Sequence, residues 1–251
     1  MSGVIEQMIE YAWAPPPRIR LKPGARKDPK YNRYYRKWGF TIYRTYYSKE
    51  SDEYWQSLLY SLRHQTKLAF GRYDDEETDQ DDRRQVQKLF YLEVCEDPIR
   101  LGGLDVYGLR EFLKAESRKE NKPTKRGELS VITTPDENQG MADYLFDHVL
   151  LADETVLKDI ERGISIVKAV SLSWDGHTGG YGWVRIPTGY LLDLWTYLMW
   201  NDDRLEIALR YNGSEEDLAQ QVWPGDMALD YTGKYSEIRP WRHYSNQDEM
   251  Y

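Results

Sequence analysis

Residues 38–70 carry the most regular pattern of the chain, WGFTIYRTYYSKESDEYWQSLLYSLRHQTKLAF. Residues 38–47 alternate and are rich in aromatic and β-branched side chains, which is typical of a β-strand. Ser51 can cap a helix, and apolar residues at helical spacing follow it. These apolar positions are Tyr54, Leu58, Leu59 and Leu62. The stretch therefore predicts a strand followed by a helix.

Strand and helix patterns continue to alternate towards the C-terminus. Strand patterns lie at residues 86–95, 143–152, 165–174 and 182–187, with a shorter candidate at 129–133. Helix patterns lie at residues 105–120, 153–163 and 188–213. Residues 74–84, DDEETDQDDRR, contain no apolar side chain and predict a solvated loop.

This order of elements predicts an α+β fold, with a single central sheet, flanking helices and ferredoxin-like βαβ units. A Rossmann-like α/β fold is the alternative, because periodicity does not reveal the direction of a strand. The α/β core domain is expected at residues 38–213. Residues 1–37 predict a basic, proline-containing extension, and residues 214–251 a polar tail rich in Tyr and Trp.

The composition favours an intracellular globular protein. Of 251 residues, 40% are hydrophobic and 30% are charged, and no run approaches the ~18 apolar residues of a membrane span. The first residues lack the pattern of a secretory signal, and the single cysteine, Cys95, cannot form an intramolecular disulfide. We therefore expect a cytoplasmic protein with no membrane partner. The composition does not indicate an oligomeric state.

Charge is distributed unevenly along the chain. The net charge is −8, but residues 18–37 hold nine basic residues and one acid, which leaves −16 on the remainder. Tyrosines alternate with these cations, as in proteins that bind single-stranded nucleic acid. The segment either wraps the acidic body of its own chain or contacts a polyanion. In the second case the candidate residues for contact with the polyanion are Arg26, Lys27, Lys30, Arg33, Arg36 and Lys37.

Several common catalytic signatures are absent. The sequence has no phosphate-binding loop, no dinucleotide fingerprint, no H-E-x-x-H and no G-x-S-x-G. We therefore expect no cofactor and a substrate that arrives already activated. Asp175 and His177 lie in the glycine-rich stretch 175–182, which suits general acid–base chemistry but more often forms a hairpin turn. His148 and Cys95 fall in strand patterns, where buried structural roles are usual.

Asp202, Asp203 and Glu206 form the strongest cluster of chemical groups. On a helix Glu206 lies on the same face as the two aspartates. Such a cluster can hold a divalent metal, bind a guanidinium or ammonium group, or supply a general base. It can also be a solvated helix start that complements the helix dipole. Aromatic residues directly precede it and are the candidate substrate-binding residues: Trp195, Tyr197 and Trp200.

The D-D-x-x-E motif at residues 202–206, in a short Trp- and Tyr-rich chain without a nucleotide motif, resembles the fungal arginine-containing cyclodipeptide synthases. The resemblance implies an enzyme that takes arginyl-tRNA and a second aminoacyl-tRNA and releases cyclo(Arg-X). It also implies that Asp202, Asp203 and Glu206 are the catalytic residues, and that the basic residues between Arg26 and Lys37 are the candidate tRNA-binding residues. The motif is similar to the metal motif of terpene cyclases too, but their second metal motif is not found here. We therefore assign no metal ligands, and the sequence does not reveal a metal requirement.

The residues themselves are compatible with this activity. An aminoacyl ester is already activated, so amide formation needs no ATP. The acidic cluster can bind an arginyl guanidinium or deprotonate the attacking amine. Two alternatives stay open: a non-enzymatic module that binds nucleic acid or protein through residues 1–37, and another small biosynthetic enzyme, a cyclase or dehydratase, that uses Asp175 and His177.

Overall fold

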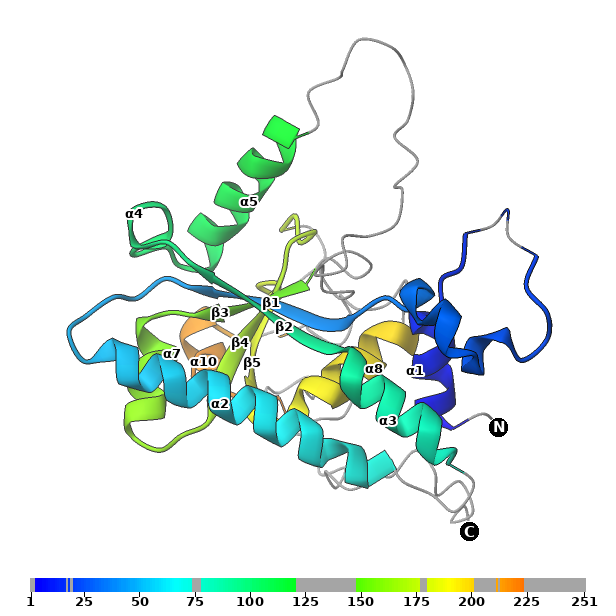
Figure 1. Ribbon diagram of the computed structural model, residues 1–251. Coiled ribbons are helices and arrows are strands. Elements are labelled where there is room, and N and C mark those ends of the chain that lie inside the picture. Colours follow the sequence, from blue (N-terminus) through cyan, green and yellow to red (C-terminus); the bar gives the residue numbers. More distant parts are fainter. Residues whose placement is uncertain are drawn as a thin grey trace.

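The computed structural model describes residues 3–16, 18, 20–73, 78–120, 148–176, 180–200, 211 and 213–223, without the side chains of residues 117–120 and Trp200. Five strands form one sheet in the order β2-β1-β3-β4-β5 (Figure 1). The strands are β1 (Trp38–Arg44), β2 (Phe90–Glu96), β3 (His148–Ala152), β4 (Ile166–Ser171) and β5 (Trp183–Pro187). Each lies within or overlaps a predicted strand pattern.

The sheet is mixed in direction. β1 runs parallel to both of its neighbours, β2 and β3, whereas β4 runs antiparallel to β3 and β5. Helix α2 (Ser51–Ala69) therefore lies within a parallel βαβ unit, but α7 (Glu154–Glu161) joins antiparallel strands. The predicted α+β fold with one central sheet and flanking helices is confirmed. Ferredoxin-like units are not confirmed by this strand order.

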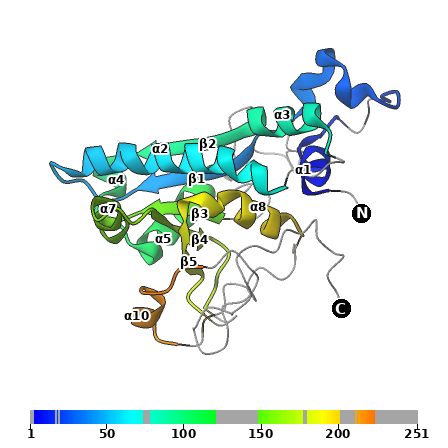
Figure 2. The same cartoon turned by 90° about the horizontal axis from the view of Figure 1, so that it is seen from below.

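Helices cover both sides of the sheet (Figures 1 and 2). α2, α7 and α8 (Leu191–Trp200) gather on one side, and α5 (Val106–Glu120) lies on the other. Trp38, Phe40 and Ile42 alternate along β1 and are almost completely buried. The Trp38 ring meets the rings of Phe70 and Trp195, so this face of β1 packs against the α2 and α8 layer. The main apolar core lies between the sheet and that layer.

Gly39 allows β1 and β2 to approach each other closely. Its φ is +135°, and a Cβ atom at this position would lie 2.0 Å from the backbone oxygen of Tyr91. Only glycine fits such a contact without a shift of the backbone. The glycine in the second position of the 38–47 pattern is therefore part of the pairing between these two strands.

The first helix belongs to the core. The sequence predicts residues 1–37 as an extension, but α1 (Val4–Ala12) packs against α3 (Gln80–Leu89). Its buried residues are Val4, Ile5, Met8, Ile9 and Ala12. The short 3-10 helices η1 (Ala25–Lys27) and η2 (Pro29–Tyr34) follow before β1.

Helix α3 (Gln80–Leu89) covers residues that the sequence predicts as part of a loop and as the start of a strand. The Asp79 carboxylate caps it by accepting hydrogen bonds from the backbone N–H groups of Asp81 and Asp82. The acids at its first turn suit the positive end of the helix dipole. The prediction of a loop over 74–84 is thus wrong for residues 80–84, and β2 begins at Phe90 rather than at Val86.

The remaining elements are short. They are η3 (Phe70–Tyr73), α4 (Pro98–Leu101), η4 (Thr188–Tyr190) and α10 (Glu215–Leu218). In the described part of the predicted tail, Leu218 and Trp223 are buried. The strand predicted at 129–133 lies outside the described residues. Among the helices that the structure describes, none combines the length and the apolar character that crossing a bilayer requires.

Candidate functional site

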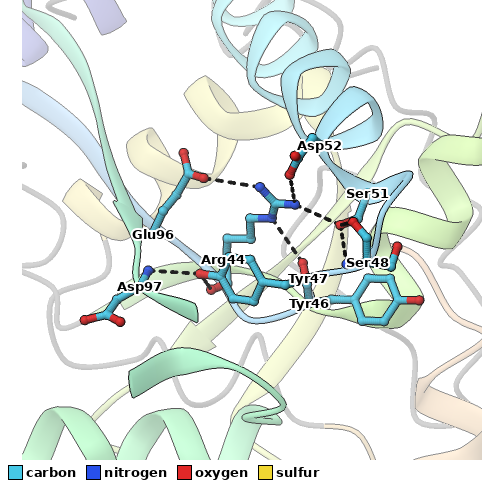
Figure 3. Close-up of polar contacts among 8 residues, drawn as sticks. All are labelled: Arg44, Tyr46, Tyr47, Ser48, Ser51, Asp52, Glu96 and Asp97. Atoms are coloured by element: carbon cyan, nitrogen blue, oxygen red, sulfur yellow. Dashed lines mark hydrogen bonds and ion pairs between the residues drawn. The ribbon is translucent and has the colours of Figure 1, made fainter. Parts of the chain in front are cut away.

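The carboxyl ends of the parallel strands β1 and β2 carry a dense polar network. Arg44 and Glu96 end these strands and are partners in register. Ligand sites of open α/β sheets usually lie at this edge. Figure 3 shows that the Arg44 side chain lies between Glu96 on one side and the first turn of α2 on the other. The network therefore occupies a position where a binding site is expected.

The guanidinium group of Arg44 is fully engaged within the protein. Its Nη1 donates to Glu96 at 3.2 Å, and its Nη2 donates to Ser51 at 2.8 Å and to Asp52 at 2.5 Å. Its Nε donates to the backbone oxygen of Tyr46 at 3.0 Å. The rings of Tyr47 and Trp55 flank the cation at 4.7 and 5.7 Å.

This network is a structural clamp rather than a ligand site. The Arg44 side chain is only 4% exposed, and its donors already bind protein oxygens. The Tyr47 hydroxyl extends the clamp, because it donates to the Arg44 carbonyl oxygen and accepts from the Asp97 N–H. The clamp joins β1, β2 and the start of α2.

Helix α8 places the predicted aromatic residues in the core. Trp195 has no exposed surface, and its ring meets those of Trp38 at 5.5 Å and Tyr11 at 6.4 Å. Tyr197 is 6% exposed and meets the Trp223 ring at 6.2 Å. Both residues therefore pack within the fold in this state. A substrate-binding role for them stays a prediction, and the side chain of Trp200 lies outside the described residues.

Asp202, Asp203 and Glu206 also lie outside the described residues, and their catalytic role stays a prediction. The motif follows a described helix along the chain. It starts two positions after the end of the described part of α8, a helix whose apolar side chains are buried. The hydroxyl of Tyr11 in α1 donates to the backbone oxygen of Met199 at 3.2 Å. The described end of α8 is thus joined to α1.

The basic segment, residues 18–37, contacts the C-terminal end of α1, where Tyr11 lies. The Arg36 N–H donates to the Ala12 carbonyl oxygen at 2.8 Å, and the Arg36 guanidinium donates to the Tyr11 carbonyl oxygen at 2.9 Å. Trp13 and Tyr35 form an antiparallel bridge, and their rings lie 4.9 Å apart. The basic segment and the described part of α8 are therefore both joined to the C-terminal end of α1.

The basic residues of this segment are engaged in different ways. Arg26 pairs with Asp82 at 2.9 Å, Lys27 pairs with Asp79, and Lys30 pairs with Asp28 at 2.5 Å. The cations that lie over aromatic rings are Lys30, Arg33 and Lys37, over Tyr31, Tyr34 and Tyr91 respectively. The segment thus does contact acids of its own chain, through Arg26, Lys27 and Lys30.

Sequence reasoning missed a buried carboxylate at the start of α8. Asp193 accepts hydrogen bonds from Tyr73 at 2.7 Å and from Arg72 at 2.8 Å. Burial raises the pKa of Asp193, and burial together with the Asp193 charge raises the pKa of Tyr73. The only sequence signal is an aspartate inside the apolar run LLDLW. The network ties η3 to η4 and α8.

A buried arginine on α5 was missed as well. Arg110 donates to the backbone oxygens of Ser171, Tyr181 and Gly182 at 2.6–2.9 Å, and its guanidinium lies 4.7 Å from the Trp174 ring. Burial lowers the pKa of Arg110. The side chain fixes α5 to the connection between β4 and β5.

Those of the other candidate groups that the structure describes lie on different elements. His148 is buried in β3, in agreement with its predicted place in a strand, and Cys95 is partly buried in β2. Asp175 is exposed, and His177 lies outside the described residues. Within the described ranges, no three His, Cys, Asp or Glu side chains are placed to hold a metal ion.

Comparisons of the chain with protein-family models, with curated proteins and with solved structures gave no match. The site is therefore interpreted from its own residues.

Proposed function

We propose that this chain is an aminoacyl-tRNA-dependent synthase of an arginine-containing cyclodipeptide, cyclo(Arg-X), in the cytoplasm as part of fungal secondary metabolism. The observation that supports the proposal most is the hydrogen bond between Tyr11 and Met199. It joins α1, which precedes and receives the basic segment, to α8, which leads into the acidic motif. A polyanionic tRNA and a cationic arginyl group have opposite charges, so the substrate needs both kinds of surface close together.

The chemistry requires no cofactor. The α-amine of one aminoacyl-tRNA attacks the ester carbonyl of the other. An amide forms, and the tRNA of the attacked ester leaves with its terminal hydroxyl. The free amine of the resulting dipeptidyl-tRNA then attacks its own ester, which closes the diketopiperazine and releases the second tRNA. Two ester bonds are replaced by two amide bonds. Proximity of the two esters supplies much of the rate, and a carboxylate that accepts the amine proton contributes ~10²–10⁴-fold.

In this proposal Asp202, Asp203 and Glu206 bind the arginyl guanidinium or remove the amine proton. A charge-assisted hydrogen bond from a guanidinium contributes ~1.5–3 kcal/mol. Arginine is the amino acid that such a cluster would select, because its planar donor group matches carboxylates in a bidentate geometry.

Expression in a host that supplies charged tRNAs tests the proposal. Cells fed with isotopically labelled arginine should produce a labelled diketopiperazine that mass spectrometry detects. Asp202→Asn and Glu206→Gln should each lower its yield ~100-fold or more, if the carboxylate acts as general base or guanidinium ligand. Glu111→Gln is the matched control, since Glu111 lies exposed on α5, and should leave the yield unchanged. Wild-type yield from either motif variant would contradict the assignment.

A further inference from the structure

The structure divides the basic segment into two parts. Arg26 and Lys27, in η1, pair with Asp82 and Asp79 at the start of α3, and the Lys27 side chain stays exposed. Their charges are balanced by carboxylates of the same chain. Lys30 and Arg33, in η2, have exposed side chains that lie over tyrosine rings, and Lys30 also pairs with Asp28 inside the segment. η1 is therefore joined to α3 by ion pairs, whereas η2 combines its cations with two tyrosine rings.

η2 presents a stack of rings and cations. The rings of Tyr31 and Tyr34 are stacked, with centroids 5.8 Å apart and planes 17° apart. The Lys30 ammonium lies 4.7 Å from the Tyr31 centroid, and the Arg33 guanidinium lies 5.1 Å from the Tyr34 centroid. A 3-10 helix has three residues per turn, so positions three apart lie above one another. We name Lys30, Tyr31, Arg33 and Tyr34 the tyrosine platform.

The tyrosine platform is held in place before any partner arrives. The Asp28 carboxylate caps η2 by accepting from the Lys30 N–H at 3.1 Å, and Pro29 fixes the first helical residue. The Tyr34 carbonyl oxygen accepts from the Ala14 N–H at 2.9 Å, and the Trp13 ring meets the Tyr34 ring edge-on at 6.0 Å. A preorganised surface loses little conformational entropy when it binds.

We infer that the tyrosine platform binds unpaired nucleotides of an RNA end, which under the proposed function is the single-stranded 3′ end of the charged tRNA. Bases stack on aromatic rings and on guanidinium planes, and neighbouring cations bind the phosphates. A base that stacks on the Tyr31 ring displaces the Lys30 ammonium, which then exchanges its ion pair with Asp28 for the phosphate of that nucleotide. Duplex RNA keeps its bases stacked inside the helix and cannot use the rings. An acidic peptide would use the cations alone.

Fluorescence anisotropy with the full chain tests this inference. The probes are a short single-stranded RNA ending in CCA, a duplex of the same length, and a polyglutamate peptide. We expect the single strand to bind tightest, and Tyr31→Ala to weaken it about tenfold. Tyr31→Phe keeps the ring and should bind within about twofold of the wild type. Arg33→Ala should weaken binding and lower the salt dependence by about one counterion.

Lys27→Ala and Lys67→Ala control for loss of charge alone. Lys27 lies in the same segment but pairs with Asp79, and Lys67 is an exposed cation on α2. Both should weaken RNA binding less than Arg33→Ala does. Equal losses for Lys27→Ala and Arg33→Ala, unchanged binding by Tyr31→Ala, or preference for the duplex or the peptide would overturn the inference.

The binding test is independent of catalysis. RNA binding that depends on Tyr31 and Arg33, without any diketopiperazine in cells, would support the tyrosine platform and contradict the proposed synthase. If Tyr31→Ala binds RNA and forms the product normally, the result would contradict the tyrosine platform and support the proposed synthase.

Discussion

The hydroxyl of Tyr11 donates a hydrogen bond to the backbone carbonyl oxygen of Met199, although the two residues lie 188 positions apart in the chain. This contact, with the edge-to-face contact between Tyr11 and Trp195, joins the first helix to the helix that precedes the D-D-x-x-E motif. The N-terminal segment is therefore part of the architecture on which the proposed activity depends.

Tyr11→Phe tests the energetic value of this contact. The variant keeps the ring against Trp195 and removes the hydroxyl, so the carbonyl oxygen of Met199 loses this donor. We expect the free energy of unfolding in urea to fall by ~0.5–1.5 kcal/mol. The yield of cyclo(Arg-X) should fall as well, because α1 would hold the end of α8 less firmly. An unchanged unfolding free energy would show that the contact contributes nothing.

Arg44 and Asp52 form one ion pair of the clamp, but substitutions of the two residues should lower stability by unequal amounts. Arg44→Met removes a buried side chain that joins two strands and a helix, and it should cost ~3 kcal/mol of stability. Asp52→Asn removes a carboxylate that is 80% exposed, and it should cost less than ~1 kcal/mol. Chemical denaturation of both variants measures the difference. Equal losses would mean that the ion pair itself, and not the buried arginine, stabilises this edge.

Gly39→Ala should be among the most damaging small substitutions. A Cβ atom would collide with the Tyr91 carbonyl oxygen, and the positive φ is strained for alanine. We expect a loss of ~3 kcal/mol or more, measured as a lower thermal midpoint or loss of soluble protein. Gly71→Ala is the matched control, since a Cβ there meets no atom within 4 Å, and should change stability by less than ~1 kcal/mol. Similar effects of both substitutions would contradict the close approach of β1 and β2.

The contact between η1 and α3 should depend on pH. The pKa of Asp79 is lowered from 3.8 to about 2. The largest cause is the hydrogen bond from Lys27, and the backbone N–H groups of Asp82 and Asp81 contribute less. A lowered carboxyl pKa stabilises the folded state above pH 3.8, and this stabilisation is lost as the pH falls towards 2. An NMR titration of the Asp79 carboxyl carbon measures the shift, and Lys27→Ala should move its midpoint upwards. A midpoint at the ordinary value in the wild type would contradict the pairing.

The periodic parts of the fold were predictable from the sequence. β1 and α2 follow directly from alternation and from helical spacing in residues 38–70, because burial on one face imposes both patterns. Strand direction was not predictable. The crossover through α2 gives a parallel pair, whereas β3 and β4 are antiparallel, and no local pattern distinguishes the two cases.

The N-terminal third shows why other features were missed. α1 has a clear apolar face, Val4, Ile5, Met8 and Ile9, but the prolines and charges that follow suggested an extension. α3 buries only Val86 and Leu89 as apolar residues, and its many acids imitate a solvated loop while they serve its N-terminus. The sequence shows how many charged residues a segment has, whereas only the fold shows which of them form contacts with each other.

The candidate site was predictable only in part. The acidic motif and the basic segment are visible as charge clusters in the sequence, whereas their connection through Tyr11 and Met199 depends on a tertiary contact. The different engagement of Lys27 and Arg33 also depends on tertiary structure, because Lys27 finds Asp79 52 positions away. Trp195 shows the reverse case, since its place beside the motif suggested a pocket wall and the fold places it in the core.

The most direct measurement uses the purified chain with arginyl-tRNA and a second aminoacyl-tRNA, both charged beforehand and separated from ATP and synthetases. Chromatography coupled to mass spectrometry should detect cyclo(Arg-X) with release of both uncharged tRNAs, and Glu206→Gln should form it at least ~100-fold more slowly. Failure of the folded wild-type chain to form the product from charged tRNAs, or its formation only from free arginine and ATP, would contradict the account.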